Sequence, residues 1–202
     1  MNSPFTCTRG RPREFDPDVA LAAALRVFWQ RGYEGASLVE LTEAMGITKP
    51  SLYACFGNKE ALFRRALDLY ERDKLSYVRK ALEAPSAREV AERLLRGGLD
   101  IHCSSGDPQG CLGVISAVAC GAEAESIRRE VLARRASSEA AMVERFARAR
   151  DEGDLPPSFT PEAIVCYLTT VMQGMSLKAG AGVPREQLEQ LVETTLAIWP
   201  RV

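Results

Sequence analysis

Residues 37–56 constrain the fold most, because they carry the start and stop signals of two short helices. Ser37 and Glu40 form a capping box, in which the serine side chain can accept from the Glu40 amide while the glutamate reaches back to Ser37. Gly46 suits the end of the first helix, and Thr48 can cap the second. Two short helices joined by about three residues match the helix-turn-helix pattern.

Helical periodicity extends over the rest of the chain. Apolar residues recur at three and four positions, Ala, Leu, Arg and Glu dominate, and sustained alternation with β-branched residues does not occur. The start and stop signals predict helices at about 17–31, 37–45, 49–56, 58–82, 87–103, 111–121, 124–151, 161–178 and 185–199. We therefore predict an all-α protein of about nine helices, in which a three-helix N-terminal head precedes a larger helical domain.

Composition excludes several classes of protein. Apolar residues make up 46% of the 202 residues and charged residues 26%, which rules out wholesale disorder. The N-terminus shows no apolar signal region and the apolar runs are too short or too interrupted to span a bilayer, so we expect a soluble cytoplasmic protein that contacts no membrane. The formal net charge is −1, so any contact with nucleic acid has to come from a local patch.

The cysteines and the single histidine argue against a metal centre, a cofactor or an enzyme active site. Neither a CxxC pair nor zinc-ligand spacing occurs, and a disulfide framework is not expected in a reducing compartment. A nucleophile–base–orienter set, which an enzyme would need, is also missing. The six cysteines are Cys7, Cys55, Cys103, Cys111, Cys120 and Cys166, and the histidine is His102.

Two lysines supply the local charge. Lys49 and Lys59 each stand at a helix start, where a cation is mildly disfavoured because that end of a helix carries partial positive charge. The stretch 44–59 contains both lysines and no acidic residue. Either these lysines are solvated or an anion lies in front of both. Residues 8–13 add three arginines, which suit either the tracking of a DNA backbone or minor groove, or a tail that aids solubility.

A wider set of residues surrounds the two short helices. It comprises Phe28, Gly32-Tyr33, Ser37, Leu41, Gly46-Ile47-Thr48, Ser51, Leu52-Tyr53, Phe56 and Lys59-Glu60-Ala61-Leu62-Phe63. This set resembles the N-terminal signature of TetR-family transcriptional regulators. The resemblance implies a flexible basic arm at 1–15, a helix-turn-helix DNA-binding domain at 16–64, and an effector-binding and dimerisation domain at 65–202.

The resemblance also implies which residues contact DNA. Helix N-termini offer free amides to phosphate oxygens, and helix-turn-helix modules dock their second helix by its N-terminal residues. The implied contacts are Ser37, Thr48, Lys49, Pro50, Ser51, Tyr53 and Lys59. For Tyr53 the alternative is half-buried packing. Family members usually carry histidine before Phe56, where this chain has Cys55, which puts one phosphate contact in doubt.

The last two long helices and the middle of the chain are implied to form a dimer interface and an effector cavity. The interface would comprise Val171, Gly174, Met175, Leu188, Leu191, Val192, Thr195 and Leu196, with an intramolecular core as the alternative. The cavity would be lined by Leu99, Val114, Ile115, Val118, Val143, Phe146, Tyr167 and Met172, each of which is equally a candidate for the core.

These features together predict a homodimeric transcriptional repressor that binds a pseudo-palindromic double-stranded operator and is released by a small-molecule effector. The alternative is a regulator of the same fold that senses oxidants, electrophiles or metals through Cys103 and Cys111. Cys111 begins a predicted helix, where the dipole lowers a thiol pKa. Against this alternative, buried cysteine often behaves as a small hydrophobic residue.

Overall fold

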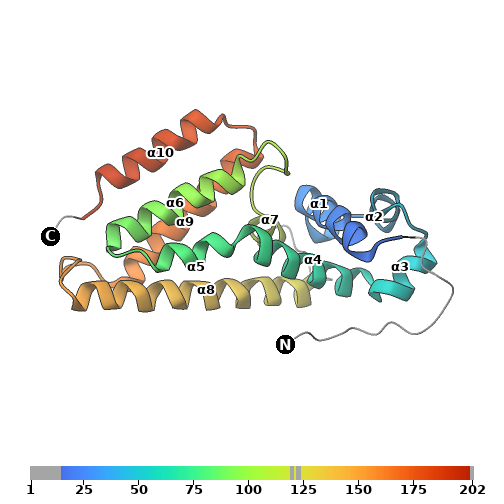
Figure 1. Cartoon of the computed structure of the whole chain (residues 1–202), viewed down its shortest axis with the longest axis horizontal. Coiled ribbons are helices and arrows are strands. Elements are labelled where there is room, and N and C mark those ends of the chain that lie inside the picture. The colour runs from blue at the N-terminus through green and yellow to red at the C-terminus, as the bar shows by residue number, and fades with distance from the viewer. Residues whose placement is uncertain (1–14, 119–120, 122–123, 201–202) are drawn as a thin grey trace.

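The computed structural model describes residues 15–118, 121 and 124–200 (Figure 1). Within these ranges the chain forms ten α-helices and no strand, which confirms the all-α prediction. The helices are α1 (Pro17–Gly35), α2 (Leu38–Met45), α3 (Lys49–Phe56), α4 (Lys59–Lys74), α5 (Ser76–Leu82), α6 (Ala87–His102), α7 (Leu112–Val118), α8 (Glu125–Asp151), α9 (Pro161–Gly180) and α10 (Arg185–Ala197). None of these helices is long and apolar enough to cross a membrane.

The first three helices gather at one end of the molecule, and the long α8 extends along the other helices (Figure 1). Helix α4 packs against α1 and leads from the small end toward α5. Helices α6, α9 and α10 pack on one another at the far end. The arrangement places the helix-turn-helix at one extremity, with its outer surface free of other described elements.

The predicted caps form at the expected residues. Ser37 Oγ accepts from the Glu40 amide at 3.1 Å, and the Glu40 carboxylate accepts from the Ser37 amide at 3.1 Å. Gly46 adopts a left-handed conformation at φ 63°, which ends α2 as glycine commonly does. Thr48 Oγ1 accepts from the Ser51 amide at 3.3 Å and thereby caps α3.

The fourth helix departs from the prediction. A single helix was expected through Leu82, but Leu75 has ψ 3° and separates α4 from α5. Neither proline nor glycine occurs near this break, so local sequence gives no signal for it. The adjoining residues are instead held by distant partners, because Lys74 Nζ lies 2.5 Å from Asp107 and the Tyr77 ring packs on Gly97 of α6.

Two hydrophobic cores hold the helices together. The first joins α1–α4 and continues into α7 and α8 through Leu112, Ile127 and Val131. At its centre the Phe63 ring meets the rings of Phe28 and Tyr33 edge to face, at centroid separations of 5.1 and 5.3 Å. The second core joins α5, α6, α8, α9 and α10. Because the first core reaches α7 and α8, the helix-turn-helix is packed directly onto the larger part of the molecule.

Candidate DNA-binding surface and effector cavity

Helix α3 presents a polar leading end to solvent. Thr48, Lys49 and Pro50 are exposed, and the Tyr53 side chain is 44% exposed, whereas Leu52 and Phe56 are buried. The Thr48 and Ser51 hydroxyls lie 2.9 Å apart. The first turn of α3 contains no acidic residue. Because Pro50 has no N–H and the Ser51 amide donates to Thr48 Oγ1, an anion would meet the Lys49 amide and the partial positive charge of the helix end.

The residues predicted to contact DNA differ in how far their polar groups are already engaged within the chain. Lys49 Nζ is 6.0 Å from the centroid of the Tyr53 ring, so the two side chains share one exposed surface. Ser37 is exposed, but its amide and hydroxyl both donate to the Glu40 carboxylate. Ser37 therefore acts as a helix cap in this structure and has part of its hydrogen-bonding capacity already used.

Lys59 is more constrained than the sequence suggested. Its Nζ lies 4.7 Å from the centroid of the Tyr33 ring and 3.4 Å from the carbonyl oxygen of Glu34. Partial burial lowers the pKa of Lys59, and the nearby Glu34 carboxylate opposes this effect. The ammonium group is thus held against the end of α1, so of the two alternatives that the sequence left open, simple solvation does not describe Lys59.

Arg65 is a residue of this surface that sequence reasoning missed. Its guanidinium lies 4.6 Å from the centroid of the Phe56 ring, and Nη1 donates to the carbonyl oxygen of Cys55 at 3.3 Å. These contacts fasten the end of α3 to α4 beside Cys55, which is half-buried. Arg65 lies ten residues beyond Cys55, so only the folded chain shows that they meet.

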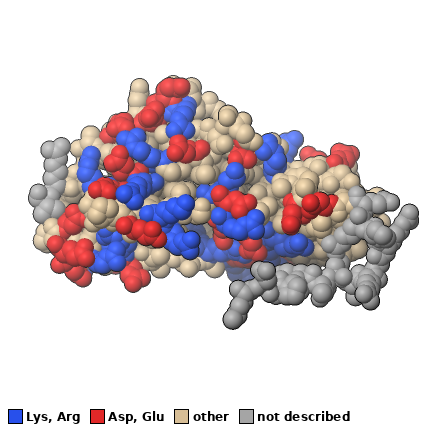
Figure 2. All heavy atoms as spheres, viewed as in Figure 1, with Lys and Arg blue, Asp and Glu red and all other residues tan. Residues whose placement is uncertain are grey.

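Charge on the remaining surface is mixed. Figure 2 shows basic and acidic side chains interspersed over the face in view, in keeping with the net charge of −1. The arginines of residues 8–13 lie outside the described residues. The basic residues of the described small end are Arg26 and Arg31 of α1, Lys49 of α3, and Lys59, Arg64 and Arg65 of α4.

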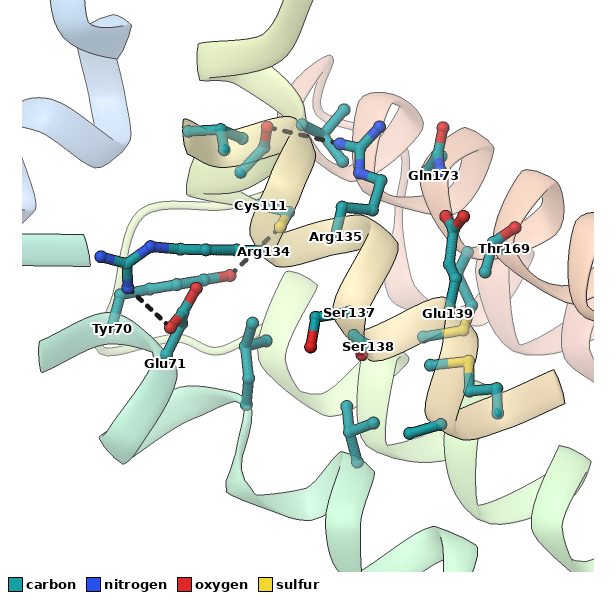
Figure 3. A pocket seen from close by; sticks show the side chains of 18 of the residues that line it. Tyr70, Glu71, Cys111, Arg134, Arg135, Ser137, Ser138, Glu139, Thr169 and Gln173 are labelled. Carbon is teal, nitrogen blue, oxygen red and sulfur yellow. Dashed lines mark hydrogen bonds and ion pairs between the residues drawn. The ribbon is translucent and has the colours of Figure 1, made fainter. Parts of the chain in front are cut away.

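A cavity of about 590 Å³ lies between α4, α5, α7, α8 and α9 (Figure 3). Its volume is typical of sites for small organic molecules. The apolar part of its wall consists of Leu67, Leu75, Val78, Leu82, Val114, Val131, Met142 and Met172. Polar residues from α8 and α9, including Arg135, Glu139 and Gln173, project around it (Figure 3).

Two of the eight residues expected to line the cavity do so, namely Val114 and Met172. Leu99 and Phe146 are buried in the second core, and Tyr167 is 40% exposed away from the cavity. Ile115 faces Gly32, at which an added Cβ would lie 3.3 Å from Ile115 Cγ2. Val143 lines a separate surface depression between α8 and α9. The Val118 side chain lies outside the described structure.

The inner wall of the cavity connects to α1. Tyr70 donates from its hydroxyl to Cys111 Sγ at 3.4 Å, and the Tyr70 ring meets the Trp29 ring edge to face at 4.7 Å. Trp29 Nε1 donates to the Gly110 carbonyl at 3.1 Å, and His102 Nδ1 lies 3.2 Å from the same oxygen. Burial lowers the pKa of His102, while the hydrogen bond to Gly110 opposes this shift. A change at Cys111 or Tyr70 therefore acts directly on a residue of α1.

Ion pairs join α4 to α8 along the cavity rim. Arg134 contacts carboxylates of Asp68, Glu71 and Glu130 at 2.6–2.8 Å (Figure 3 shows the contact to Glu71). Arg64 continues the row, with Glu130 at 2.5 Å and with Glu60 at 2.6 Å. We name Glu60, Arg64, Asp68, Glu71, Glu130 and Arg134 the ion-pair row. Its opposite charges recur every three or four residues, a signal that sequence reasoning overlooked.

The two cysteines proposed as a switch belong to different environments. Cys111 is half-buried in the cavity wall and packs against the first core, whereas Cys103 packs against the second. Burial raises the pKa of the Cys103 thiol, although Arg185 opposes the shift. The described part of the chain contains no cluster of ligands suited to a metal ion. Cys7 and Cys120 lie outside the described residues.

Most residues predicted for the dimer interface are enclosed by their own chain. Met175, Leu188, Val192, Thr195 and Leu196 are at most 3% exposed and form part of the second core or its edge. Met175 lies on the inward side of α9 and the other four on the inward side of α10, so these five side chains are packed within the protomer, the intramolecular alternative that the sequence left open. Val171, Gly174 and Leu191 remain partly exposed. The outward faces of α9 and α10 instead present Ala163, Cys166, Tyr167, Thr170, Leu177, Gln190 and Thr194.

Comparisons with known proteins bear on both regions. The family model described as "Bacterial regulatory proteins, tetR family" matches residues 20–66. The HTH-type transcriptional repressor ComR of Escherichia coli is 33% identical over 198 residues, covering 96% of this chain and 94% of ComR. The repressor BdcR of the same species is 30% identical, covering 89% of this chain and 86% of BdcR.

Solved structures resemble the whole chain. One is a triple cysteine mutant of the TetR family transcriptional regulator CifR, complexed with 26-base-pair double-strand operator DNA. It is 46% identical and has a TM-score of 0.89, covering 95% of this chain and all of that one. A putative TetR transcriptional regulator from Rhodococcus sp. RHA1 is 33% identical with a TM-score of 0.63, covering 91% of this chain and 99% of that one.

Proposed function

We propose that this chain, which belongs to the TetR family of DNA-binding transcriptional regulators, is a homodimeric repressor released from its operator by a small molecule. Family membership follows from the relatives that match nearly the whole chain. ComR and BdcR are both named as transcriptional repressors, which supports repression rather than activation for this chain. Within this proposal, residues 16–64 bind DNA, residues 65–202 bind the effector and a second subunit, and residues 1–15 form a basic arm.

The leading end of α3 supports the DNA-binding role. Thr48, Lys49 and Tyr53 are exposed together at a helix N-terminus whose first turn lacks acid. Such an end attracts phosphate through the Lys49 amide and the partial positive charge of the helix N-terminus. We assign Ser51 and Pro50 to the same contact surface. Lys59 joins it only if a phosphate draws its ammonium from the Tyr33 ring and the Glu34 carbonyl.

The outward faces of α9 and α10 support the homodimer. Gly174 has open space where a Cβ would lie, and Thr170 and Leu177 are exposed on the same side of α9. Small and apolar side chains on such a face permit close approach of a second copy. Pairing also has a functional reason, since one short recognition helix contacts few base pairs and a two-fold pair reads two half-sites.

The observation that carries effector release is the shared wall between cavity and head. Leu67, Tyr70 and Val131 line the cavity and also belong to the core that holds α1–α4. A ligand that changes their packing changes the support of the helix-turn-helix. Derepression requires only that the ligand bind the DNA-incompetent state more tightly than the DNA-bound one.

A gel-shift assay with DNA flanking the chain's own gene tests this proposal. The wild-type protein is expected to shift one discrete band with two subunits per site, and a panel of small apolar molecules is expected to contain members that abolish the shift. Sedimentation of the free protein supplies the oligomeric state. A monomeric protein that binds no such DNA would contradict the proposal.

A cysteine-sensing regulator is the second candidate, and one observation favours it. Cys111 lies in the cavity wall and accepts the Tyr70 hydrogen bond, so a modified thiol would disturb Tyr70 and its neighbour Trp29. The CifR structures carry cysteine substitutions, two of them eight residues apart, which is also the separation of Cys103 and Cys111.

Labelling with N-ethylmaleimide tests the cysteine-sensing candidate. Three results together would support the cysteine-sensing candidate. Labelled wild type and labelled Cys166→Ser should lose operator binding, whereas labelled Cys111→Ser should retain it. Cys166 is the matched control because it is exposed on α9 outside the main cavity. Operator binding that survives complete labelling of the wild type would exclude a thiol switch.

A further inference from the structure

The Tyr77 ring lines the cavity and packs against two glycines of α6 that lower the intrinsic stability of that helix. Helix α6 carries Gly97 and Gly98 in its interior, where glycine is less favourable than alanine. A Cβ at Gly97 would lie 2.2 Å from Tyr77 Cδ2, so only glycine accommodates the ring at this depth. At Gly98 a Cβ would lie 3.5 Å from the Tyr77 hydroxyl oxygen. Gly97 therefore makes room for the ring, and the hydroxyl lies beside Gly98.

The Tyr77 hydroxyl lies beside the cavity without a hydrogen-bond partner among the described residues. Tyr77 lines the cavity, and the same Gly98 position that its hydroxyl approaches is 3.5 Å from the Met172 methyl, which also lines it. Burial raises the pKa of Tyr77, so the hydroxyl keeps its proton and can donate. A hydroxyl left unpaired when an apolar ligand displaces water is unfavourable. The cavity therefore favours ligands that supply an acceptor at this point.

The surroundings of this hydroxyl are neutral. Its neighbours include Gly98, Met172 and the Tyr70 phenol. Arg79, Arg134 and Arg135 line the cavity; Arg134 is already paired with three carboxylates, and Arg135 donates to the Gly113 carbonyl at 3.4 Å. No hydrogen bond or cation–π contact joins a described cation to Tyr77, so an ionised ligand group beside its hydroxyl would lack an adjacent counter-ion, which is unfavourable. The matching ligand atom is thus an uncharged oxygen.

We propose that Tyr77 recognises an uncharged carbonyl, ether or hydroxyl oxygen on an otherwise apolar effector, and so determines the specificity of the cavity. This inference rests on the proposed function in that it takes the cavity as the effector site. Tyr77 is expected to discriminate an oxygenated ligand from its hydrocarbon counterpart by about tenfold in affinity, the effect of one hydrogen bond made in place of one lost.

Binding of 1-indanone and of indane, its hydrocarbon counterpart, tests the proposal on the full-length protein. Methyl NMR of the methionines, which include Met142 and Met172 in the cavity wall, reports occupancy and affinity. Wild type is expected to bind 1-indanone about tenfold more tightly than indane. The Tyr77→Phe variant should bind both within about twofold, because only the hydroxyl is lost.

Tyr167→Phe is the matched control, since it removes one hydroxyl from an exposed tyrosine outside the cavity. It should keep the tenfold preference. Equal affinity of wild type for both probes, no binding of either probe, or a preference that persists in Tyr77→Phe would overturn the proposal. Operator gel shifts of the same proteins distinguish a failure of the Tyr77 proposal from a failure of the proposed function. Absent DNA binding would contradict the repressor role, whereas the probe preference concerns Tyr77 alone.

Discussion

In the DNA-binding end, each helix from α1 to α4 starts at a side-chain cap, supplied in turn by Asp16, Ser37, Thr48 and Asn58. In the larger part of the molecule, Ser86 and Thr160 cap α6 and α9, whereas α5 and α8 start without a side-chain cap. Their positions depend on distant partners, as where Arg145 of α8 donates to the Ala84 carbonyl beyond α5 at 2.7 Å.

This difference separates the DNA-binding end, in which every helix is capped locally, from α5 and α8, which are held by tertiary contacts. Segments with few local constraints are those that open or shift most easily. Under the proposed function, a ligand in the cavity would act on the region of α5 and α8, and the helix-turn-helix would move as a preformed unit. The following variants test each half of this comparison, beginning with the largest effect.

Phe63→Ala should destabilise the protein by about 3–5 kcal/mol, because the ring is fully buried between two other rings and its removal leaves a cavity. Urea unfolding followed by circular dichroism measures the loss. Phe159→Ala is the control, since Phe159 is 40% exposed. A loss below about 1 kcal/mol for Phe63→Ala would show that the head is not one packed unit.

Gly97→Ala should destabilise the protein by about 1–3 kcal/mol, although alanine is the better helix former, because its Cβ would overlap the Tyr77 ring. Gly174→Ala is the matched control on α9, where nothing lies within 4 Å of the added Cβ. That substitution should be neutral or stabilising in the monomer. Similar unfolding midpoints for the two variants would contradict the tertiary placement of α5.

Ser37→Ala should cost about 1 kcal/mol, the usual effect of losing an N-cap hydrogen bond. Val39→Ala serves as control because Val39 is 64% exposed on the same helix. Thermal unfolding of the two variants compares cap and surface directly. Equal unfolding temperatures for Ser37→Ala and Val39→Ala would show that the Ser37 cap does not stabilise α2.

Acid should weaken the ion-pair row on the α4–α8 side. Hydrogen bonds from Arg64 and Arg134 lower the pKa of Glu130, although burial acts in the opposite direction. The contribution is therefore present above the unfolded-state pKa of about 4.3 and is lost as pH falls through the lower folded-state value. Urea midpoints between pH 6 and 3.5 should fall less steeply for Glu130→Gln than for wild type.

Glu144→Gln is the control for that titration, because Glu144 is exposed on α8 and forms no ion pair with a described residue. It should follow the wild-type curve. Parallel curves for all three proteins would mean that the row contributes nothing to the acid sensitivity.

The same contrast explains what sequence alone could predict. The caps at Ser37 and Thr48 rest on neighbours three residues apart, so their pattern is visible in the chain. The break at Leu75 has no such pattern, because the residues beside it contact distant partners. Lys74 pairs with Asp107, and the Tyr77 ring packs on Gly97. Apolar periodicity was enough to predict that a helix forms here. The boundary between α4 and α5 could not be predicted, because it depends on residues that are distant in sequence.

The candidate sites divide in the same way. The exposed set at Thr48, Lys49 and Tyr53 follows from the position of a helix start. Lys59 was predicted as a phosphate contact, and its packing on the Tyr33 ring could not be foreseen because Tyr33 lies on another helix. The resemblance implied a cavity among the middle helices and so pointed to Val114 and Met172, but the sequence could not distinguish cavity wall from core, because both are lined by the same residue types.

The salt dependence of operator binding tests the central claim most directly. Each neutralised phosphate contributes about −0.9 to the slope of log affinity against log salt. Wild type should show a steep negative slope, and Lys49→Ala should bind less tightly with a slope shallower by about 0.9. Lys178→Ala, on the opposite part of the molecule in α9, should match wild type. A wild-type affinity independent of salt, or equal slopes for Lys49→Ala and wild type, would contradict the assignment of α3 as the DNA-reading helix.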